Sequence, residues 1–356
     1  MSKIPADELV HIGVVVKNAQ ESAKKYARIL GIGEWQVTEH TADTLSDSTT
    51  HGSATPQHFL TATGQVQTDM GAVTFRLIEP RGGWTTYQEF LLTKGEGIHH
   101  VCTAVVDENA MAELQPWLAS EGVGIAQSAT LANGTREVFL DTKELLGGFY
   151  IELLVAGDGQ REDAPDETWD FASEVPESGP QLPLGTFQMH FGVVVNELMP
   201  RVADWSRLFG LSDWNFMNWH DGPGSLEQPE YMGKPVDHAY FTTMAEFNPL
   251  LAFEIIQPTF GPSHYKENYR NIVGEGIHHM NASLFPDADT WKGIAANNAN
   301  QGAPVVMGGG IGGGFANFYY VDTAADLGYV TEIIHPGPNW DKGPGGIQPA
   351  MSATMI

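Results

Sequence analysis

Short apolar runs typical of β-strands alternate along the chain with stretches whose apolar residues recur at helical spacing. Residues 11–16 read HIGVVV, a β-branched run that predicts a strand, and residues 20–33 carry apolar positions at helical spacing up to a pair of glycines. After residues 95–100, which read GEGIHH, the same order of strand, helix and further strands begins again. The pattern therefore predicts two units of strand, helix and strands in the first half of the chain.

The second half repeats this order. HIGVVV returns as HFGVVV at residue 190, and GEGIHH returns unchanged at residue 274, both at an offset of 179 residues. FRLIEP and FYIELL, which start at residues 75 and 149, match FEIIQP and YVTEII further along the chain. Four landmarks in constant order indicate that the chain is a duplication, with four strand and helix units in all.

The repeat divides the chain into two predicted α+β domains, at residues 1–156 and 187–340, followed by a tail at residues 341–356. The segment between the domains, residues 157–186, is acidic, rich in proline and glycine, and has little apolar periodicity. It is predicted as a linker, either a solvated tether or a strap packed over a domain.

Composition narrows the class of partner. The 18 lysines and arginines face 44 acidic residues, and the net charge of −26 repels phosphate backbones and anionic lipid headgroups, so neither nucleic acid nor a membrane is expected as a partner. The single cysteine, Cys102, cannot form an internal disulfide, and the first residues do not resemble a secretory signal. These features predict a cytoplasmic protein.

Histidines and carboxylates interrupt the apolar strands of the second copy. His190 begins HFGVVV, His278 and His279 end GEGIHH, and Glu254 and Glu332 lie within FEIIQP and YVTEII. An unpaired polar group in such a strand is costly to bury, so something should compensate it. Two imidazoles and two carboxylates can converge if their strands share one curved sheet, and this donor set suits a divalent transition metal.

These motifs, in this order, resemble the vicinal oxygen chelate superfamily, which includes glyoxalase I, methylmalonyl-CoA epimerase, extradiol dioxygenases and 4-hydroxyphenylpyruvate dioxygenase. The resemblance covers nearly all of the chain apart from the linker and tail. It implies four βαβββ modules that form two tandem glyoxalase-like domains, with curved, open-barrel mixed sheets around a metal. It also implies ligands in the second domain at His190, Glu254, His279 and Glu332, for one divalent ion of Mn, Fe, Co, Ni or Zn.

The first domain offers His11, His100 and Glu152 at the corresponding positions, but Arg76 stands where the second domain has Glu254. A guanidinium cannot ligate a cation and would repel one. The first site is therefore either metal-free, with Arg76 paired to Glu152, or a three-ligand site with Arg76 turned away.

Ligand number separates the functions that the resemblance implies. Four protein ligands leave room to chelate two neighbouring substrate oxygens and stabilise an enolate, which suits an isomerase, epimerase or lyase. Two histidines and one carboxylate would instead suit an Fe(II)-dependent dioxygenase that cleaves rings or acts on 2-oxo acids. Because Glu254 supplies a fourth ligand, the first class is preferred. A metal-free small-molecule-binding protein is a third hypothesis.

Proton transfer also requires a base near the metal. The epimerase relatives place a glutamate on the preceding strand, and the corresponding segment here holds His238 and Tyr240. We expect His238 to abstract a proton and Tyr240 to donate a hydrogen bond to a developing oxyanion. The substrate is expected to be small and oxygen-bearing, and the many aromatic residues of the second domain allow an aromatic one. Family members often dimerise, so a homodimer is one expected state.

Overall fold

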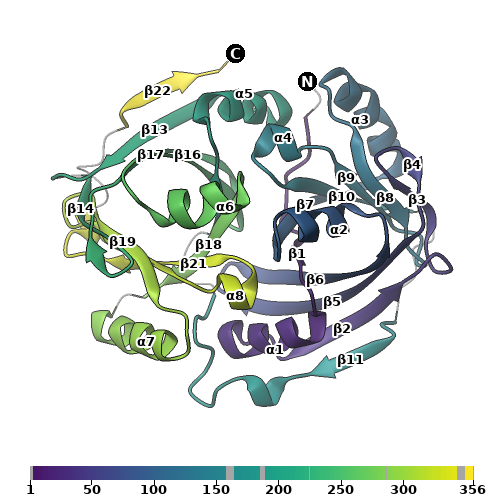
Figure 1. Ribbon diagram of the computed structural model, residues 1–356. Coiled ribbons are helices and arrows are strands. Elements are labelled where there is room, and N and C mark those ends of the chain that lie inside the picture. The colour runs from purple at the N-terminus through teal and green to yellow at the C-terminus, as the bar shows by residue number, and fades with distance from the viewer. Residues whose placement is uncertain are drawn as a thin grey trace. The chain divides into compact units, whose positions relative to one another are not determined.

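Two compact units make up the part of the chain that the structure, a computed structural model, describes (Figure 1). The first unit contains most residues up to Pro180, and the second contains most residues from Gln181 onward. The described residues are 3–157, 164–184, 189–223, 225–285, 287–342 and 349–355.

The first unit is a curved mixed sheet built from two βαβββ modules. The first module contains β1 (His11–Val15), α1 (Ala19–Leu30), β2 (Glu34–His40), β5 (Gln57–Thr68) and β6 (Gly71–Gly83). The second contains β7 (Gly97–Asp107), α3 (Glu108–Ser120), β8 (Ile125–Thr130), β9 (Arg136–Leu140) and β10 (Tyr150–Ala156). β1 pairs parallel with β6 and antiparallel with β7, so the two modules meet there, in the strand order β11-β2-β5-β6-β1-β7-β10-β9-β8-β3-β4.

The second unit repeats this plan. Its first module contains β12 (His190–Val194), α5 (Leu198–Phe209), β13 (Asp213–His220), β16 (Ala239–Asn248) and β17 (Leu251–Phe260). Its second contains β18 (Gly276–Leu284), α7 (Ala288–Asn300), β19 (Val305–Ile311), β20 (Ala316–Val321) and β21 (Val330–Pro336). The strand order is β15-β14-β19-β20-β21-β18-β12-β17-β16-β13-β22, with β12 between β17 and β18. The predicted fold of four modules in two tandem domains is confirmed.

Further short elements extend these sheets. β3 (Ser46–Thr50) and β4 (Ser53–Ala54) extend the first sheet, and β14 (Leu226–Tyr231) and β15 (Lys234–Pro235) extend the second. In the acidic segment, β11 (Glu167–Asp170) pairs antiparallel with β2 and is followed by the turn η1 (Ala172–Glu174), so the described part of this segment is a strap on the first unit. From the tail, β22 (Met351–Thr354) pairs with β13. The remaining short helices are α4 (Lys143–Leu146), α8 (Ala324–Leu327) and η3 (Trp340–Lys342).

One helix lies within the curve of each sheet (Figure 1). In the first unit this is α2 (Thr86–Thr93), whose Tyr87 and Phe90 pack with Val15, Phe59 and Ile78 on the inner face. In the second unit it is the π-helix η2 (His264–Arg270), which continues into α6 (Asn271–Val273). The sequence pattern did not predict either helix. Because they fill the inner side, they approach the residues at the centre of each sheet.

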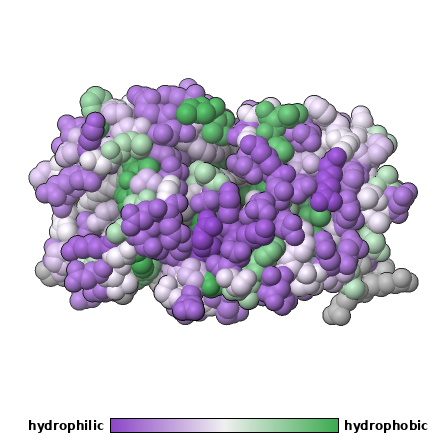
Figure 2. Space-filling model, turned by 60° about the horizontal axis from the view of Figure 1, so that its bottom comes forward, coloured by the Kyte–Doolittle hydropathy of each residue, from purple (hydrophilic) through white to green (hydrophobic). Residues whose placement is uncertain are grey.

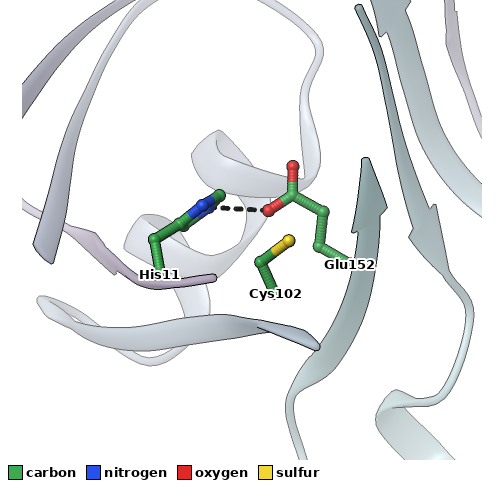
Figure 3. A group of neighbouring side chains, drawn as sticks. All are labelled: His11, Cys102 and Glu152. Atoms are coloured by element: carbon green, nitrogen blue, oxygen red, sulfur yellow. Dashed lines mark ion pairs between the residues drawn. The ribbon is translucent and has the colours of Figure 1, made fainter. Parts of the chain in front are cut away.

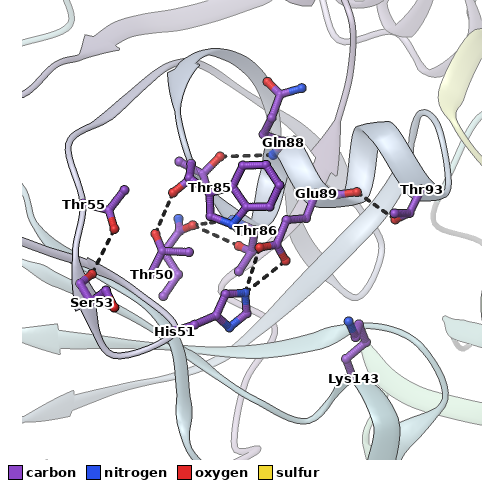
Figure 4. A network of polar contacts seen from close by, with 12 residues as sticks. Thr50, His51, Ser53, Thr55, Thr85, Thr86, Gln88, Glu89, Thr93 and Lys143 are labelled. Atoms are coloured by element: carbon purple, nitrogen blue, oxygen red, sulfur yellow. Dashed lines mark hydrogen bonds and ion pairs between the residues drawn. The ribbon is translucent and has the colours of Figure 1, made fainter.

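A polar network anchors α2 in the first unit (Figure 4). Thr85 caps the helix by accepting a hydrogen bond from the Gln88 amide at 3.1 Å, which satisfies one of the free N–H groups of the first turn. The amide and hydroxyl of Thr86 both donate to Gln127 of β8, at 2.8 and 3.0 Å. His51 lies 2.9 Å from a carboxylate oxygen of Glu89. These contacts fix the start of α2 against the far edge of the sheet.

The surface agrees with the acidic composition. On the face shown in Figure 2, hydrophilic residues predominate and hydrophobic residues form small, separate patches. Among the described residues, no helix combines the length and the apolar character needed to cross a bilayer.

Candidate metal centre

Four neighbouring strands of the second sheet bring the predicted ligands together. His190 comes from β12, Glu254 from β17, His279 from β18 and Glu332 from β21. Glu254 and His279 both pair in register with Gly192 of the central strand, one from each side. The curved sheet therefore gathers side chains that are far apart in the sequence, as the duplication pattern predicted.

The donor atoms of these residues lie close to one another. His190 Nε2 is 3.0 Å from Glu332 Oε2 and 3.8 Å from Glu254 Oε2. His279 Nε2 is 3.6 Å from Glu332 Oε2 and 3.8 Å from Glu254 Oε2. Ligands that bind a transition metal at about 2.0–2.2 Å lie roughly 3–3.6 Å from one another. The donor atoms of His190, His279 and Glu332 all lie within 4.8 Å of one another and would suit one ion after a slight contraction, whereas Glu254 lies outside this group and would have to move closer to join it.

An unpaired polar atom supports this fit. Nε2 of His279 is buried with no hydrogen-bond partner among the described residues, and Nε2 of His190 is buried with the Glu332 carboxylate 3.0 Å away. A buried polar atom without a partner carries a desolvation cost of about 1–3 kcal/mol. A cation bound at these two atoms would remove that cost, so the residues present fit a divalent metal.

The pKa shifts within the cluster also favour a bound cation. Burial and the neighbouring Glu332 carboxylate raise the pKa of Glu254 to about 7, although His190 opposes this shift. Burial would also raise the pKa of Glu332, but contacts with His190 and His279 outweigh it and lower the pKa to about 2. Burial lowers the pKa of His279 to about 3. Without a cation the cluster retains a proton near neutral pH, and a cation would displace it.

A second layer of residues orients Glu332 and was missed from the sequence. Asn281 donates from Nδ2 to Glu332 Oε2 at 2.7 Å, and the Tyr320 hydroxyl donates to Glu332 Oε1 at 2.9 Å. Asn281 follows His279 by two positions on the same strand, and this alternation was the available signal for it. Tyr320 lies opposite Glu332 in the β20–β21 ladder, a pairing that the sequence pattern alone did not predict.

The two predicted catalytic residues lie at different places relative to this cluster. Tyr240 is buried, its ring meets that of Tyr265 edge to face at 5.2 Å, and the carboxylates of Glu254 and Glu332 are among the charges that raise its pKa. His238 is also buried, with its ring centroid 6.0 Å from that of Tyr240. Nδ1 of His238 lies 3.2 Å from the Val236 carbonyl oxygen, and its Nε2 has no hydrogen-bond partner among the described residues.

Three tyrosines and Glu332 form a line of hydrogen bonds. Tyr320 donates to the carboxylate, the hydroxyls of Tyr265 and Tyr320 are 2.5 Å apart, and Tyr240 hydrogen-bonds with Tyr265. Each hydroxyl has only one proton, so Tyr265 donates to Tyr320 and Tyr240 donates to Tyr265. Tyr240 would therefore have to release Tyr265 before it could donate to a substrate oxygen.

In the first unit, the corresponding cluster already contains its own cation. His11 Nε2 is 2.7 Å from Glu152 Oε2, His100 Nε2 is 3.2 Å from the same oxygen, and Cys102 lies beside them (Figure 3). Arg76 forms a buried ion pair with Glu137 and lies 4.0 Å from Glu152 Oε1. Burial alone would lower the pKa of Arg76, but the Glu137 carboxylate outweighs it, and the guanidinium stays charged.

Glu137 was not predicted as a site residue. It pairs in the β9–β10 ladder with Leu154, two positions from Glu152, whereas Phe318 occupies the matching position in the second unit. The first copy thus combines Arg76 with Glu137, and the second combines Glu254 with Phe318. Arg76 is paired mainly to Glu137 rather than to Glu152, and it faces the cluster.

Residues 10–139 match the model of the Glyoxalase/Bleomycin resistance protein/Dioxygenase superfamily. A variant of 4-hydroxymandelate synthase from Streptomyces coelicolor shares the fold, with a TM-score of 0.56 and 12% identity over 94% of this chain and 93% of that chain. No curated protein matches the sequence.

Two further solved structures are similar at lower TM-scores. A halotolerant catechol dioxygenase has a TM-score of 0.39 and 11% identity, over 94% of this chain and 88% of that chain. A methylmalonyl-CoA epimerase from Streptomyces coelicolor has a TM-score of 0.30 and 21% identity, over 44% of this chain and 99% of that chain. At 12% identity, the likeness to the 4-hydroxymandelate synthase structure shows the fold alone.

Proposed function

We propose that the chain is a tandem-duplicated member of the glyoxalase/bleomycin resistance protein/dioxygenase superfamily, whose model matches residues 10–139, and that it is a divalent-metal-dependent isomerase, epimerase or lyase. The observation that carries the proposal is the convergence of four donor atoms at the centre of the second sheet, from His190, Glu254, His279 and Glu332. The first unit, with Arg76 at the position of Glu254, is proposed to hold no metal.

The number of ligands favours proton transfer over oxygen chemistry. A divalent ion held by these residues would act as a Lewis acid toward oxygen atoms of a substrate. Glu254 adds a fourth donor to the two histidines and Glu332, and so occupies a position that a dioxygenase with two histidines and one carboxylate leaves open. The site then suits a substrate with two neighbouring oxygen atoms and an acidic C–H bond beside a carbonyl.

The aromatic residues around the cluster define the kind of substrate. Tyr240, Tyr265 and Phe318 are buried in one cluster on the inner side of the sheet, and Trp219 packs against it. Such side chains exclude water and favour flat or apolar groups. We therefore propose a small, oxygen-bearing substrate, and these side chains would also accept an aromatic one.

His238 is proposed as the base. Burial lowers its pKa, which keeps the imidazole neutral near pH 7, and its Nε2 has no partner among the described residues.

General bases contribute about 10²–10⁴-fold to rate. We expect His238→Ala to lose turnover by about this factor and to retain the metal. The matched control is His58→Ala, since His58 lies in the first unit and pairs with Glu39 on a half-exposed strand. Equal turnover in the two variants would remove His238 from the mechanism.

The reaction class can be tested with a screen of aromatic and 2-oxo compounds in deuterated buffer. The proposal predicts deuterium uptake at the carbon beside the carbonyl, without consumption of dioxygen. Incorporation of oxygen together with dioxygen uptake would show a dioxygenase instead. Tight binding with no chemical change, in a protein that takes up no metal, would show a small-molecule-binding protein.

A further inference from the structure

Two adjacent residues of the helix η2, His264 and Tyr265, reach toward the candidate metal centre from the inner side of the sheet. Both are buried, and neither belongs to the four predicted ligands. Between Tyr265 and the repeated GEGIHH motif, the second copy has one more residue than the first copy has between Tyr87 and the same motif. The wider turns of the π-helix η2 accommodate this extra residue. Such one-residue insertions often occur at functional sites.

His264 is connected to a ligand through one intervening histidine. His264 Nδ1 lies 2.8 Å from His278 Nε2, and His278 Nδ1 lies 3.1 Å from Nδ1 of the ligand His279. All three rings are buried. The line of three imidazoles therefore runs from η2 to Nδ1 of His279. Nε2, on the other side of the His279 ring, faces the carboxylates of Glu254 and Glu332.

This line allows two arrangements of its protons, and only one of them leaves Nε2 of His279 free. For Nε2 of His279 to bind a cation, its proton must be on Nδ1, which then donates to His278 Nδ1. His278 must carry its own proton on Nε2, which donates to His264 Nδ1. Burial lowers the pKa of His264, so its ring stays neutral and Nδ1 can accept. The tautomer of His279 thus depends on His264.

Tyr265 is connected to another ligand in the same way. Its hydroxyl donates to the Tyr320 hydroxyl at 2.5 Å, and Tyr320 donates to Glu332 Oε1 at 2.9 Å. The hydrogen bond from Tyr265 directs the Tyr320 proton toward the carboxylate, because a hydroxyl that accepts from one neighbour is free to donate to another. Adjacent residues of one helix therefore act on an imidazole ligand and on a carboxylate ligand.

The first unit provides an internal comparison. Thr85 and Ser263 cap the corresponding helices, so Thr86 stands at the position of His264, and Tyr87 at that of Tyr265. The pair His99 and His100 keeps its contact at 2.8 Å, but His99 hydrogen-bonds with the backbone of Thr86 and not with a third imidazole. Phe139 stands at the position of Tyr320 and has no hydroxyl to donate to Glu152.

We infer that His264 and Tyr265 are positioning residues for the metal of the second unit. His264 holds His279 in the tautomer that presents Nε2, and Tyr265 holds Glu332 through Tyr320. Both links occur in the unit with four metal-binding side chains, and neither occurs in the unit where Arg76 replaces one of them. The inference rests on the proposed metal site and adds the element that organises it.

The test uses the full chain and Co²⁺ alone as the probe. Affinity is measured by calorimetry, and the tautomer of His279 by ¹⁵N NMR of the metal-free protein. Partners that orient metal ligands typically contribute about 10–100-fold to metal affinity. We expect His264→Thr, which introduces the residue of the first copy, to weaken Co²⁺ binding within this range and to populate both tautomers of His279. Tyr265→Phe should weaken it by about tenfold, at the lower end of the range.

Two variants separate positioning from packing. Tyr87→Phe makes the same change at the equivalent position of the first unit, and should leave Co²⁺ affinity unchanged. His264→Gln keeps a group that can accept the proton of His278, so it should recover most of the affinity and the single tautomer. If His264→Thr fails to fold, His264→Gln and Tyr265→Phe, which keep side-chain volume, still give a result.

The outcomes distinguish this inference from the proposed function. Wild-type protein that binds no Co²⁺, or binding that survives Glu332→Ala, would overturn the metal site itself. Binding that Glu332→Ala abolishes, but that His264→Thr and Tyr265→Phe leave within about twofold of wild type, would overturn the inference alone, given the range expected for such partners. A protonated Nε2 on His279 in the metal-free wild type would also contradict it.

Discussion

A buried guanidinium and a partly exposed carboxylate occupy the same position in the two copies, Arg76 in the first and Glu254 in the second. The guanidinium carries a permanent positive charge, so its pairing with Glu137 balances the first cluster internally. The carboxylate instead adds negative charge to a site where Nε2 of His279 has no hydrogen-bond partner among the described residues. One residue therefore decides whether a cluster is balanced by its own side chains or by an added ion.

Removal of Glu137 should destabilise the first unit strongly. Glu137→Ala leaves Arg76 buried without its main partner, and loss of one member of a buried ion pair costs about 3–5 kcal/mol. Glu108→Ala is the matched control, because its pair with Arg136 is exposed and contributes about 0–1 kcal/mol. Urea unfolding of the two variants measures the difference. Equal losses would mean that the Arg76–Glu137 pair does not stabilise the unit.

Metal affinity should depend on pH through Glu254. Its pKa is about 7 in the metal-free protein, above the ordinary value for a carboxyl, so below this pH a metal must displace its proton. Glu332, with a pKa of about 2, is already ionised and adds no such step. Burial would lower the pKa of His190, but its contact with Glu332 outweighs this and raises it, so His190 must also lose a proton to bind the metal. We therefore expect affinity to rise by at least tenfold per pH unit below about pH 7 and to become less steep above it. Calorimetry with Co²⁺ at several pH values measures this slope, and a flat profile below pH 7 would contradict it.

Residues with a repeated motif could be predicted from the sequence, and residues that depend on strand pairing could not. The four proposed ligands converge as the motif order indicated. Glu137, in contrast, lies in EVFLD at the start of a short apolar run, where a carboxylate would ordinarily be expected to face solvent. Its burial beside Arg76 depends on which strands become neighbours, and local periodicity does not contain that information.

At the scale of elements, HIGVVV and HFGVVV both have a glycine two positions after their histidine, and this shared position has a steric cause. Gly13 and Gly192 lie directly beneath the rings of His100 and His279, where a Cβ atom would overlap the imidazole. The glycine of the central strand therefore gives the histidine of the neighbouring strand its place over the sheet. This close approach is the physical reason for glycine two positions after the first histidine of each copy.

Substitution of this glycine should displace the ligand. Gly192→Ala places a methyl group in the space of the His279 ring, and overpacking of this kind costs about 1–3 kcal/mol. We expect Gly192→Ala to abolish metal binding, while Gly13→Ala destabilises the first unit to a similar degree and leaves metal binding intact. Metal analysis and thermal unfolding of both variants give the comparison. Metal retained by Gly192→Ala would show that His279 can bind from another position.

The elements that the sequence did not reveal are short and depend on tertiary contacts. α2 has 8 residues and η2 has 7, too few for a clear apolar period, and both are held by packing on the inner face of their sheets. The longer helices that cross over between strands have 12 or 13 residues, and the first of them, predicted at residues 20–33, is observed at Ala19–Leu30. The inner helices were therefore missed although one of them carries His264 and Tyr265.

At the scale of the whole molecule, duplication has kept one architecture and changed the chemistry of its centres. Both sheets have the same order of module strands, with β1 and β12 as the central strands. The described parts of the acidic segment and of the tail each add an edge strand, β11 to the first sheet and β22 to the second. The account therefore assigns a structural centre to the first unit and a metal centre to the second.

Metal stoichiometry tests this assignment most directly. Purified wild-type protein, Glu332→Ala and Glu152→Ala are compared by elemental analysis after equilibration with a divalent transition metal. The account predicts one ion per chain in the wild type and in Glu152→Ala, and none in Glu332→Ala. A wild type without metal, or a bound ion that Glu332→Ala retains and Glu152→Ala loses, would contradict it.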